Sequence, residues 1–98
     1  NKFCPIEVTT NNDLDNYRTS GFYGVWFTST AQTIANLPGN SSCGYLRVVV
    51  NKEGLTGEWR VGVQIMYDIV NWKIWVRQIG TDGSRNFTKS AWKGVALA

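Results

Sequence analysis

Two stretches in the second half of the chain alternate between apolar and polar side chains with a period of two. Residues 61–67 read VGVQIMY and residues 72–78 read WKIWVRQ. In the first stretch the odd positions are apolar, and in the second the even positions are. This alternation is typical of strands whose two faces meet different surroundings. We therefore predict one strand in each stretch.

The short connection between these strands predicts a hairpin. A four-residue loop, residues 68–71, would place Tyr67 opposite Trp72 and Ile65 opposite Ile74. In this register the apolar positions share one face, and a slip of one residue would mix the two faces. We expect the apolar face to be buried and the other face, with Lys73, Trp75 and Arg77, to be exposed.

Other segments complete a mainly β pattern. Residues 22–28 and 45–50 are rich in aromatic and β-branched side chains, which favours strands. Residues 12–17 and 30–37 have the capping and stop signals of short helical turns. We predict a small antiparallel sheet domain, mainly β with α+β as the alternative, and one or two helical turns.

Length and composition limit the number of domains and the kinds of partner that the chain can have. A chain of 98 residues predicts one domain, spanning 1–98, with a thin hydrophobic core. Five Trp residues are many for this size and indicate a core, a subunit interface or a ligand platform. The net charge of +3 comes from scattered cations, which does not favour nucleic acid as a partner. No apolar run approaches the ~20 residues of a membrane span, so we expect no membrane insertion.

The residues needed for most catalysis are missing. The chain has no His, which removes the commonest general base and metal ligand. Cys4 and Cys43 belong to no C-x-x-C pair, so zinc chemistry has no support. They form either one disulfide or two buried thiols. We therefore expect no enzyme, no catalytic residue, no metal and no cofactor.

The best candidate binding residues lie on the polar face of the predicted hairpin. Lys73, Trp75 and Arg77 combine a flat ring with two cations, and Trp59-Arg60 would extend the surface from an adjacent strand. Trp and Arg are enriched at binding hot spots, and a flat ring stacks on a sugar face. Two alternatives stay open: Trp75 packs under a loop, or this face is a subunit contact.

Several short motifs also follow one another in a set order. They read Asp13-Leu14-Asp15, Thr19-Ser20-Gly21-Phe22-Tyr23, Asn36-Leu37-Pro38-Gly39, Gly44-Tyr45-Leu46-Arg47-Val48-Val49-Val50, Gln64-Ile65, Trp75-Val76-Arg77 and Trp92-Lys93. In this order they resemble the pyocin knob domain, a module of the tail fibres of bacteriophages and phage-tail-like bacteriocins. The resemblance covers residues 13–93. The chain departs from it at Phe87 and Lys89, where members often place a further Trp, and in a long insert at 51–59.

The resemblance implies a virion component made in the cytoplasm of a bacterial host. It implies a homotrimeric tail fibre whose knob binds host-surface polysaccharide or lipopolysaccharide, and it carries over no catalytic residue. The alternatives are a trimerisation or capping module without a ligand, or an accessory domain of a polysaccharide-degrading tail spike. Because the chain begins at Asn1 without an initiator Met, we expect it to be part of a longer fibre protein.

Overall fold

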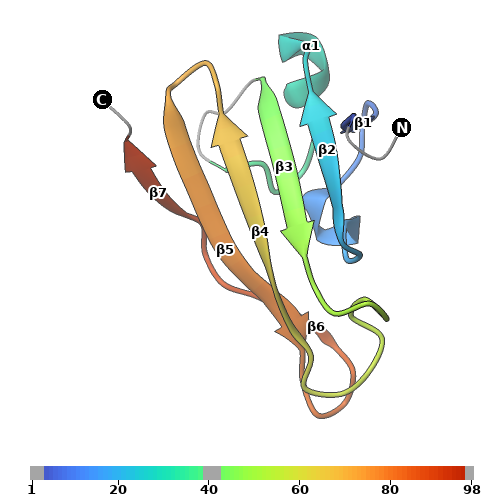
Figure 1. Cartoon of the computed structure of the whole chain (residues 1–98). Helices are drawn as coiled ribbons and strands as arrows, with labels where there is room; N and C mark the ends of the chain where they lie inside the picture. Colours follow the sequence, from blue (N-terminus) through green and yellow to red (C-terminus); the bar gives the residue numbers. More distant parts are fainter. Residues whose placement is uncertain (1–3, 39–42, 97–98) are drawn as a thin grey trace.

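The computed structural model describes residues 4–38 and 43–96 of the chain (Figure 1). With 44% strand and 8% helix, the protein is mainly β, as predicted. The described strands are β1 (Ile6–Glu7), β2 (Gly21–Val25), β3 (Gly44–Val49), β4 (Val61–Asp68), β5 (Lys73–Thr81), β6 (Phe87–Lys89) and β7 (Lys93–Ala96). The helical turns are η1 (Leu14–Asn16) and α1 (Thr28–Ala31).

The strands form one sheet in the order β1-β2-β3-β4-β5-β6. Strands β2 to β5 are an antiparallel meander, but β1 runs parallel to β2. The predicted antiparallel sheet is therefore a mixed one, because the chain returns through η1 to start β2 in the same direction as β1. Strands β6 and β7 share one edge of β5: β6 pairs with its last residues, 79–81, and β7 with its first, 73–76 (Figure 1).

The predicted β4–β5 hairpin is present, with its register shifted by two residues. Tyr67 lies opposite Ile74 and Ile65 opposite Val76. Asp68 belongs to β4 and accepts a hydrogen bond from the Asn71 backbone N–H at 3.0 Å, so the turn lies one residue further along the chain. Trp72 has a φ of 56° and closes this turn instead of pairing. A shift of two preserves the predicted division of side chains between the faces.

The two helical turns are shorter than predicted. Asp13 caps η1 by accepting a hydrogen bond from the backbone N–H of Asp15 at 2.9 Å. The second turn ends at Ala31, not at Leu37, and the chain then bends back so that Ala35 bridges Asp13. Asn36 supports this bend with a φ of 63°.

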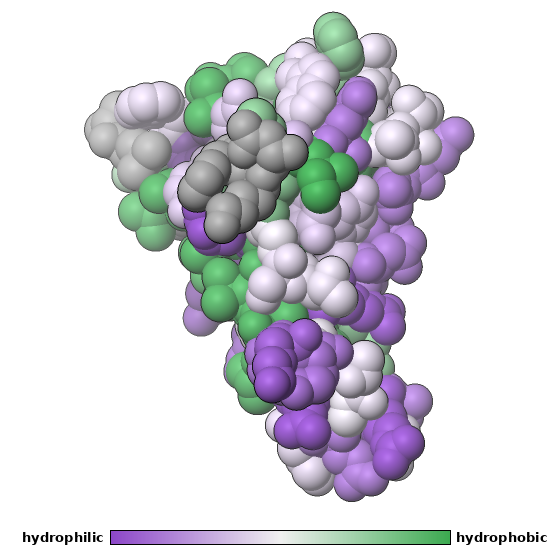
Figure 2. All heavy atoms as spheres, turned by 45° about the vertical axis from the view of Figure 1, so that its right-hand side comes forward, coloured by the Kyte–Doolittle hydropathy of each residue, from purple (hydrophilic) through white to green (hydrophobic). Residues whose placement is uncertain are grey.

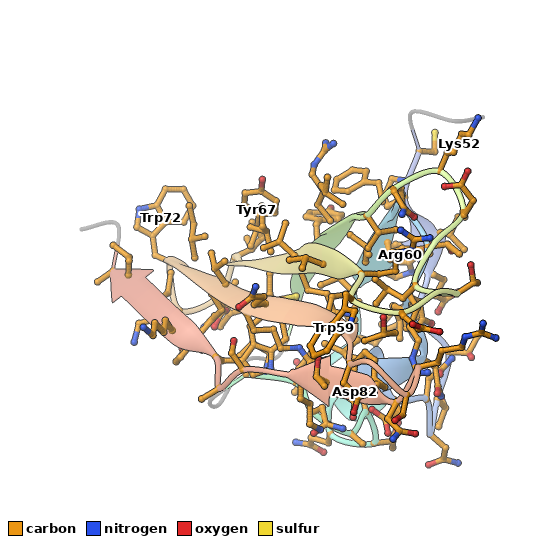
Figure 3. The ribbon with its side chains drawn as sticks, turned by 90° about the horizontal axis from the view of Figure 1, so that it is seen from below. Lys52, Trp59, Arg60, Tyr67, Trp72 and Asp82 are labelled. Atoms are coloured by element: carbon orange, nitrogen blue, oxygen red, sulfur yellow. The ribbon has the colours of Figure 1, made fainter. Side chains whose placement is uncertain are left out.

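The hydrophobic core lies on one face of the sheet only. The segment from β1 through η1 and α1 covers this face, which we call the covered face (Figure 1). Leu46, Val48 and Met66 point into it from the strands, and Leu14 and Ile34 come from the covering segment. Figure 3 shows Tyr67 and Trp72 pointing away from this segment.

Close packing beneath the sheet makes Gly44 a sensitive position. A Cβ at Gly44 would overlap the backbone carbonyl oxygen of Tyr67 and lie 3.0 Å from the Met66 methyl group. Since the carbonyl belongs to a central strand, Gly44→Ala is expected to lower the free energy of unfolding by about 1–3 kcal/mol. Urea unfolding measures this loss. Gly57→Ala is the control, because its Cβ meets only the flexible Arg60 side chain, and an equal loss there would contradict the prediction.

Candidate functional site

The covered face of the β4–β5 hairpin is occupied by a polar cluster around Arg77. Arg77 is 2% exposed and Gln64 is fully buried. The Nε of Arg77 donates to Gln64 Oε1 at 2.7 Å, and its Nη2 donates to Asp15 Oδ1 at 2.9 Å. The guanidinium also lies 4.7 Å from the centre of the Trp92 ring. We call these four residues the arginine cluster, and it joins η1, the hairpin and the C-terminal segment.

Further hydrogen bonds tie this cluster to the covering segment. Gln64 Nε2 donates to the backbone carbonyls of Leu14 at 2.8 Å and Tyr17 at 3.0 Å. Lys89 Nζ lies 2.6 Å from Asp15 Oδ2. Burial acts to raise the pKa of Asp13, but the hydrogen bonds from Asn36 and Asp15 outweigh it and lower that pKa. These bonds hold η1 against the sheet.

The prediction that Arg77 lies on an exposed face is therefore wrong. The two faces of the hairpin are divided as expected, but the face that carries Arg77 is the covered one. The physical reason is that the guanidinium donates hydrogen bonds to Gln64 and Asp15 and lies over the Trp92 ring. These contacts replace the hydrogen bonds to water that it gives up on burial. The expectation that the apolar face of the hairpin is buried is wrong as well, since Val61 is 64% and Val76 38% exposed on the other side of the sheet.

Trp75 and Lys73 also lie on the arginine side of the sheet, near the β7 edge. Trp75 is partly buried against the core, and its Nε1 donates to Asp68 Oδ2 at 3.4 Å. A Cβ at Gly94 would lie 2.8 Å from the Trp75 ring, so β7 packs closely on this indole. Lys73 Nζ lies 4.8 Å from the ring centre. The alternative in which Trp75 packs under a loop is therefore met only in part: Trp75 is packed, but against strand β7, and Arg77 does not reach water.

Trp59 and Arg60 lie away from these three residues. They directly precede β4, beside the end of β5, whereas Lys73 begins β5 at the opposite end. Figure 3 places Trp59 next to Asp82. The structure therefore does not bring the five predicted binding residues together, and it separates one exposed pair from three that are buried or partly buried.

Trp59 is the most exposed aromatic residue among those described. Its side chain is 74% exposed, and its φ of 55° is unusual for a bulky residue. Its N–H donates to the Asp82 carbonyl at 3.2 Å, and the Thr81 N–H donates to the Arg60 carbonyl at 2.9 Å. A Cβ at Gly83 would lie 2.8 Å from the indole, so the ring rests on this glycine. The fold thus holds the indole ring pointing outward, in contact with Gly83.

Charged residues lie next to Trp59 in the chain and in the turn of residues 82–86 that pairs with it. The backbone N–H groups of Asn86 and Ser84 donate to Asp82 Oδ1 at 2.9 and 2.8 Å, and they lower the pKa of Asp82. Arg85 and Glu58 form an exposed ion pair at 3.7 Å. Figure 2 shows hydrophilic side chains gathered at this lower end of the molecule. We call Trp59, Arg60, Asp82 and Gly83 the indole platform.

Only two of the four residues of the indole platform can be predicted from the sequence. Trp59 and Arg60 stand out by residue type. Asp82 and Gly83 are more than 20 residues away and read as ordinary turn residues. Their signal is the turn sequence TDGS itself, which predicts a tight reversal but not what lies against it.

The sheet face opposite the core carries no covering segment among the described residues. We call it the open face, and cross-strand pairing assigns to it Glu7, Phe22, Trp26, Tyr45, Arg47, Val49, Val61, Val63, Ile65, Tyr67, Ile74, Val76, Gln78, Lys93 and Val95. The Phe22 and Tyr45 ring centres are 5.7 Å apart, and the Arg47 guanidinium lies 5.3 Å from the Phe22 ring. This face is apolar and aromatic with few charges.

The remaining candidate chemistry is sparse. Cys4 is exposed and Cys43 is half-buried, and both are free thiols, so neither a disulfide nor a pair of buried thiols is present. Within residues 4–38 and 43–96, no three His, Cys, Asp or Glu side chains are grouped to hold a metal ion. None of the helices described is long and apolar enough to cross a membrane.

Comparisons with protein-family models, curated proteins and solved structures found no match for this chain. The interpretation of the site therefore depends on its own geometry.

Proposed function

We propose that this chain is a non-catalytic adhesion domain that binds bacterial surface glycan through the indole platform. The observation that carries the proposal is the outward, seated ring of Trp59, 74% exposed on a left-handed backbone. A large apolar ring and an uncommon backbone conformation both cost free energy, and such costs gather at binding sites. The neighbouring strands over-determine this conformation through backbone hydrogen bonds.

The chemistry around the ring favours a carbohydrate. One face of a pyranose ring presents C–H groups, which stack on an indole, while its hydroxyls form hydrogen bonds at the edge. Asp82 accepts such bonds as a carboxylate, and Arg60 donates them. Arg60 and Arg85 would also attract the carboxylate or phosphate groups of acidic polysaccharide and lipopolysaccharide, in agreement with the net charge of +3.

The wider role follows from the ordered motifs of residues 13–93, which resemble the pyocin knob. On this proposal the domain belongs to a phage tail fibre and acts in the virion at host attachment. Presentation of several copies in one fibre would multiply a modest single-site affinity by avidity. The domain would supply recognition, and any polysaccharide cleavage would belong to another part of the parent chain.

Replacing Trp59 tests this function. Trp59→Ala is expected to weaken binding to intact host cells and to extracted lipopolysaccharide or capsular polysaccharide about tenfold, because a stacking hot spot contributes more than about 1 kcal/mol. Calorimetry on the extracted glycans measures the affinity. Gly83→Ala should weaken binding in the same direction, since its Cβ would displace the indole.

The matched control is Trp72→Ala. Trp72 is 54% exposed and has a φ of 56°, but it lies in the β4–β5 turn at the other end of the sheet. Its loss should leave glycan affinity unchanged. Full binding by Trp59→Ala, or equal weakening by both variants, would overturn the proposal. Release of sugar products by this chain alone would contradict its non-catalytic part.

A second candidate function has its own supporting observation. The open face favours a module that assembles or caps a fibre without a ligand, because an apolar sheet face is normally buried by a second layer. Under this alternative the chain would bind no glycan at any concentration yet still self-associate.

A further inference from the structure

The open face is too apolar for a surface that stays in water. Among the described residues, twelve large hydrophobic side chains are exposed, against ten that form the buried core. Five of the exposed ones lie on strands of the open face: Tyr45 at 37%, Val49 at 47%, Val61 at 64%, Val76 at 38% and Val95 at 66%. Contiguous apolar patches of more than a few hundred Å² mark interaction surfaces.

The open face also extends across most strands of the sheet. Strands β2, β3, β4, β5 and β7 are neighbours. Their outward residues form two rows that cross all five strands and a third row, Val49-Val63-Gln78, that crosses three. With strands about 4.8 Å apart and rows about 6.7 Å apart, the flat footprint of these three rows is roughly 400 Å². Protruding side chains make the accessible area larger than this footprint. A standard interface buries about 800 Å² per partner, so the flat footprint is about half of this value before side-chain protrusion is counted.

Charges on this face are placed at its two opposite edges. Glu7 lies on β1, the first strand of the sheet, opposite Gly24 of β2. Its neighbour Val8 is fully buried on the covered side, so Glu7 points to the open face. Lys93 lies opposite Val76 on β7, at the other edge. Arg47, between them, is engaged with the Phe22 ring. The face therefore has an acidic edge, an apolar centre and a basic edge.

We infer that the open face binds a second copy of this chain, with the β1 edge of one copy against the β7 edge of the other. Turning one copy by half a turn about an axis parallel to the strands places each acidic edge on a basic edge. The aliphatic centres then meet face to face in an aligned sandwich, with sheets about 10 Å apart. One self-complementary patch serves both copies, as a symmetric interface requires.

The chemistry of the centre disfavours the other occupants. The aliphatic side chains of Val49, Ile65 and Val76 form no hydrogen bonds, so a sugar chain lying on them would lose its bonds to water. The groups of this face that can form hydrogen bonds, on Tyr45, Tyr67 and Gln78, lie around these three. A lipid surface could accept this apolar centre. Its head groups, however, are anionic or zwitterionic, and they would not attract the acidic edge. This inference is independent of the indole platform, which lies outside the open face.

The first test is the mass of the full chain in solution. Sedimentation equilibrium between micromolar and millimolar concentrations is expected to show reversible association of identical copies. Val76→Lys places a charge in the centre of the face and should raise the dissociation constant about a hundredfold. A chain that stays monomeric across this range would overturn the inference.

The second test identifies the edges by exchanging their charges. Glu7→Lys and Lys93→Glu should each raise the dissociation constant about tenfold, because like charges would then meet. The double variant restores opposite charges and should recover the original constant. Failure of the double variant to recover, with circular dichroism showing folded protein, would overturn the proposed edge pairing. Vesicle binding by the Val76 surface without self-association would overturn the choice of partner.

The control for these variants is Trp59→Ala, which should leave the mass unchanged. An unsubstituted chain that self-associates but binds no glycan would contradict the platform proposal alone. An unsubstituted chain that binds glycan but stays monomeric would contradict the open-face inference alone. The two proposals can therefore fail separately.

Discussion

Arg77→Ala is expected to lower the free energy of unfolding by about 3–5 kcal/mol, because it removes one partner of a buried charge network. Arg77 is 2% exposed and contacts three separate parts of the chain. The side-chain amide oxygen of Gln64 accepts the 2.7 Å hydrogen bond from Arg77 Nε. Without Arg77 this oxygen would be buried and would lack that donor. A buried unpaired acceptor alone costs about 1–3 kcal/mol.

Two further losses add to this cost. Asp15 would keep only its 2.6 Å contact with Lys89, which is 40% exposed and therefore more screened by water. The Trp92 ring would lose the guanidinium that lies 4.7 Å from its centre. Because these contacts join η1 to the C-terminal segment, we expect both ends of the covering structure to loosen together.

Urea unfolding followed by Trp fluorescence measures this effect. Arg85→Ala is the matched control, since it also removes an arginine from an ion pair, but one that is 69% exposed with a 3.7 Å separation. Its expected cost is below about 1 kcal/mol. Comparable losses in the two variants would show that water reaches the arginine cluster and that its bonds contribute little.

The arginine cluster also shows why the sequence pattern predicts the wrong exposed face of the hairpin. Arg and Lys are exposed in most proteins, so alternation with Trp75 favours placing Arg77 in water. Its burial depends on Asp15, which is 62 residues away in sequence. Local periodicity contains no information about such a distant partner. Sequence therefore predicts which side chains share a face, and tertiary contacts decide which face is covered.

The hairpin register has a related explanation. A period of two separates registers that differ by one residue but not those that differ by two. The observed alignment, with Tyr67 opposite Ile74, is therefore as compatible with the pattern as the predicted one. Asp68 decides between them, because its carboxylate accepts the Asn71 N–H and places the turn after β4. Turn chemistry, not hydrophobic pattern, fixes this register.

Strand β1 and half of the indole platform could not be predicted for another reason. Strand β1 has only two residues, too few to display any period. Gly83 matters because the Trp59 ring rests on it, and this contact joins two loops that are distant in sequence. Trp59 stands out in the sequence by residue type, since Trp and Arg are among the residues most enriched at binding hot spots.

Leu14→Ala is expected to lower the free energy of unfolding by about 2–5 kcal/mol. Leu14 is fully buried and is the central apolar anchor of η1 against the sheet. Its backbone carbonyl accepts the 2.8 Å bond from Gln64, which fixes η1 in place and limits how far the site can collapse around a smaller side chain. A cavity that cannot collapse adds to the lost transfer free energy, so the upper half of this range is expected.

Ile6→Ala is the matched control for Leu14→Ala, because it removes the same number of carbon atoms from a side chain that is 63% exposed on β1. Its expected cost is within about 0.5 kcal/mol, as for other exposed positions. Urea unfolding at micromolar protein keeps self-association from entering either value. If Leu14→Ala cost no more than the control, η1 would not be part of the cooperative core. The covering segment would then be a loosely held flap, and the arginine cluster beneath it would lie in water whenever that flap opened.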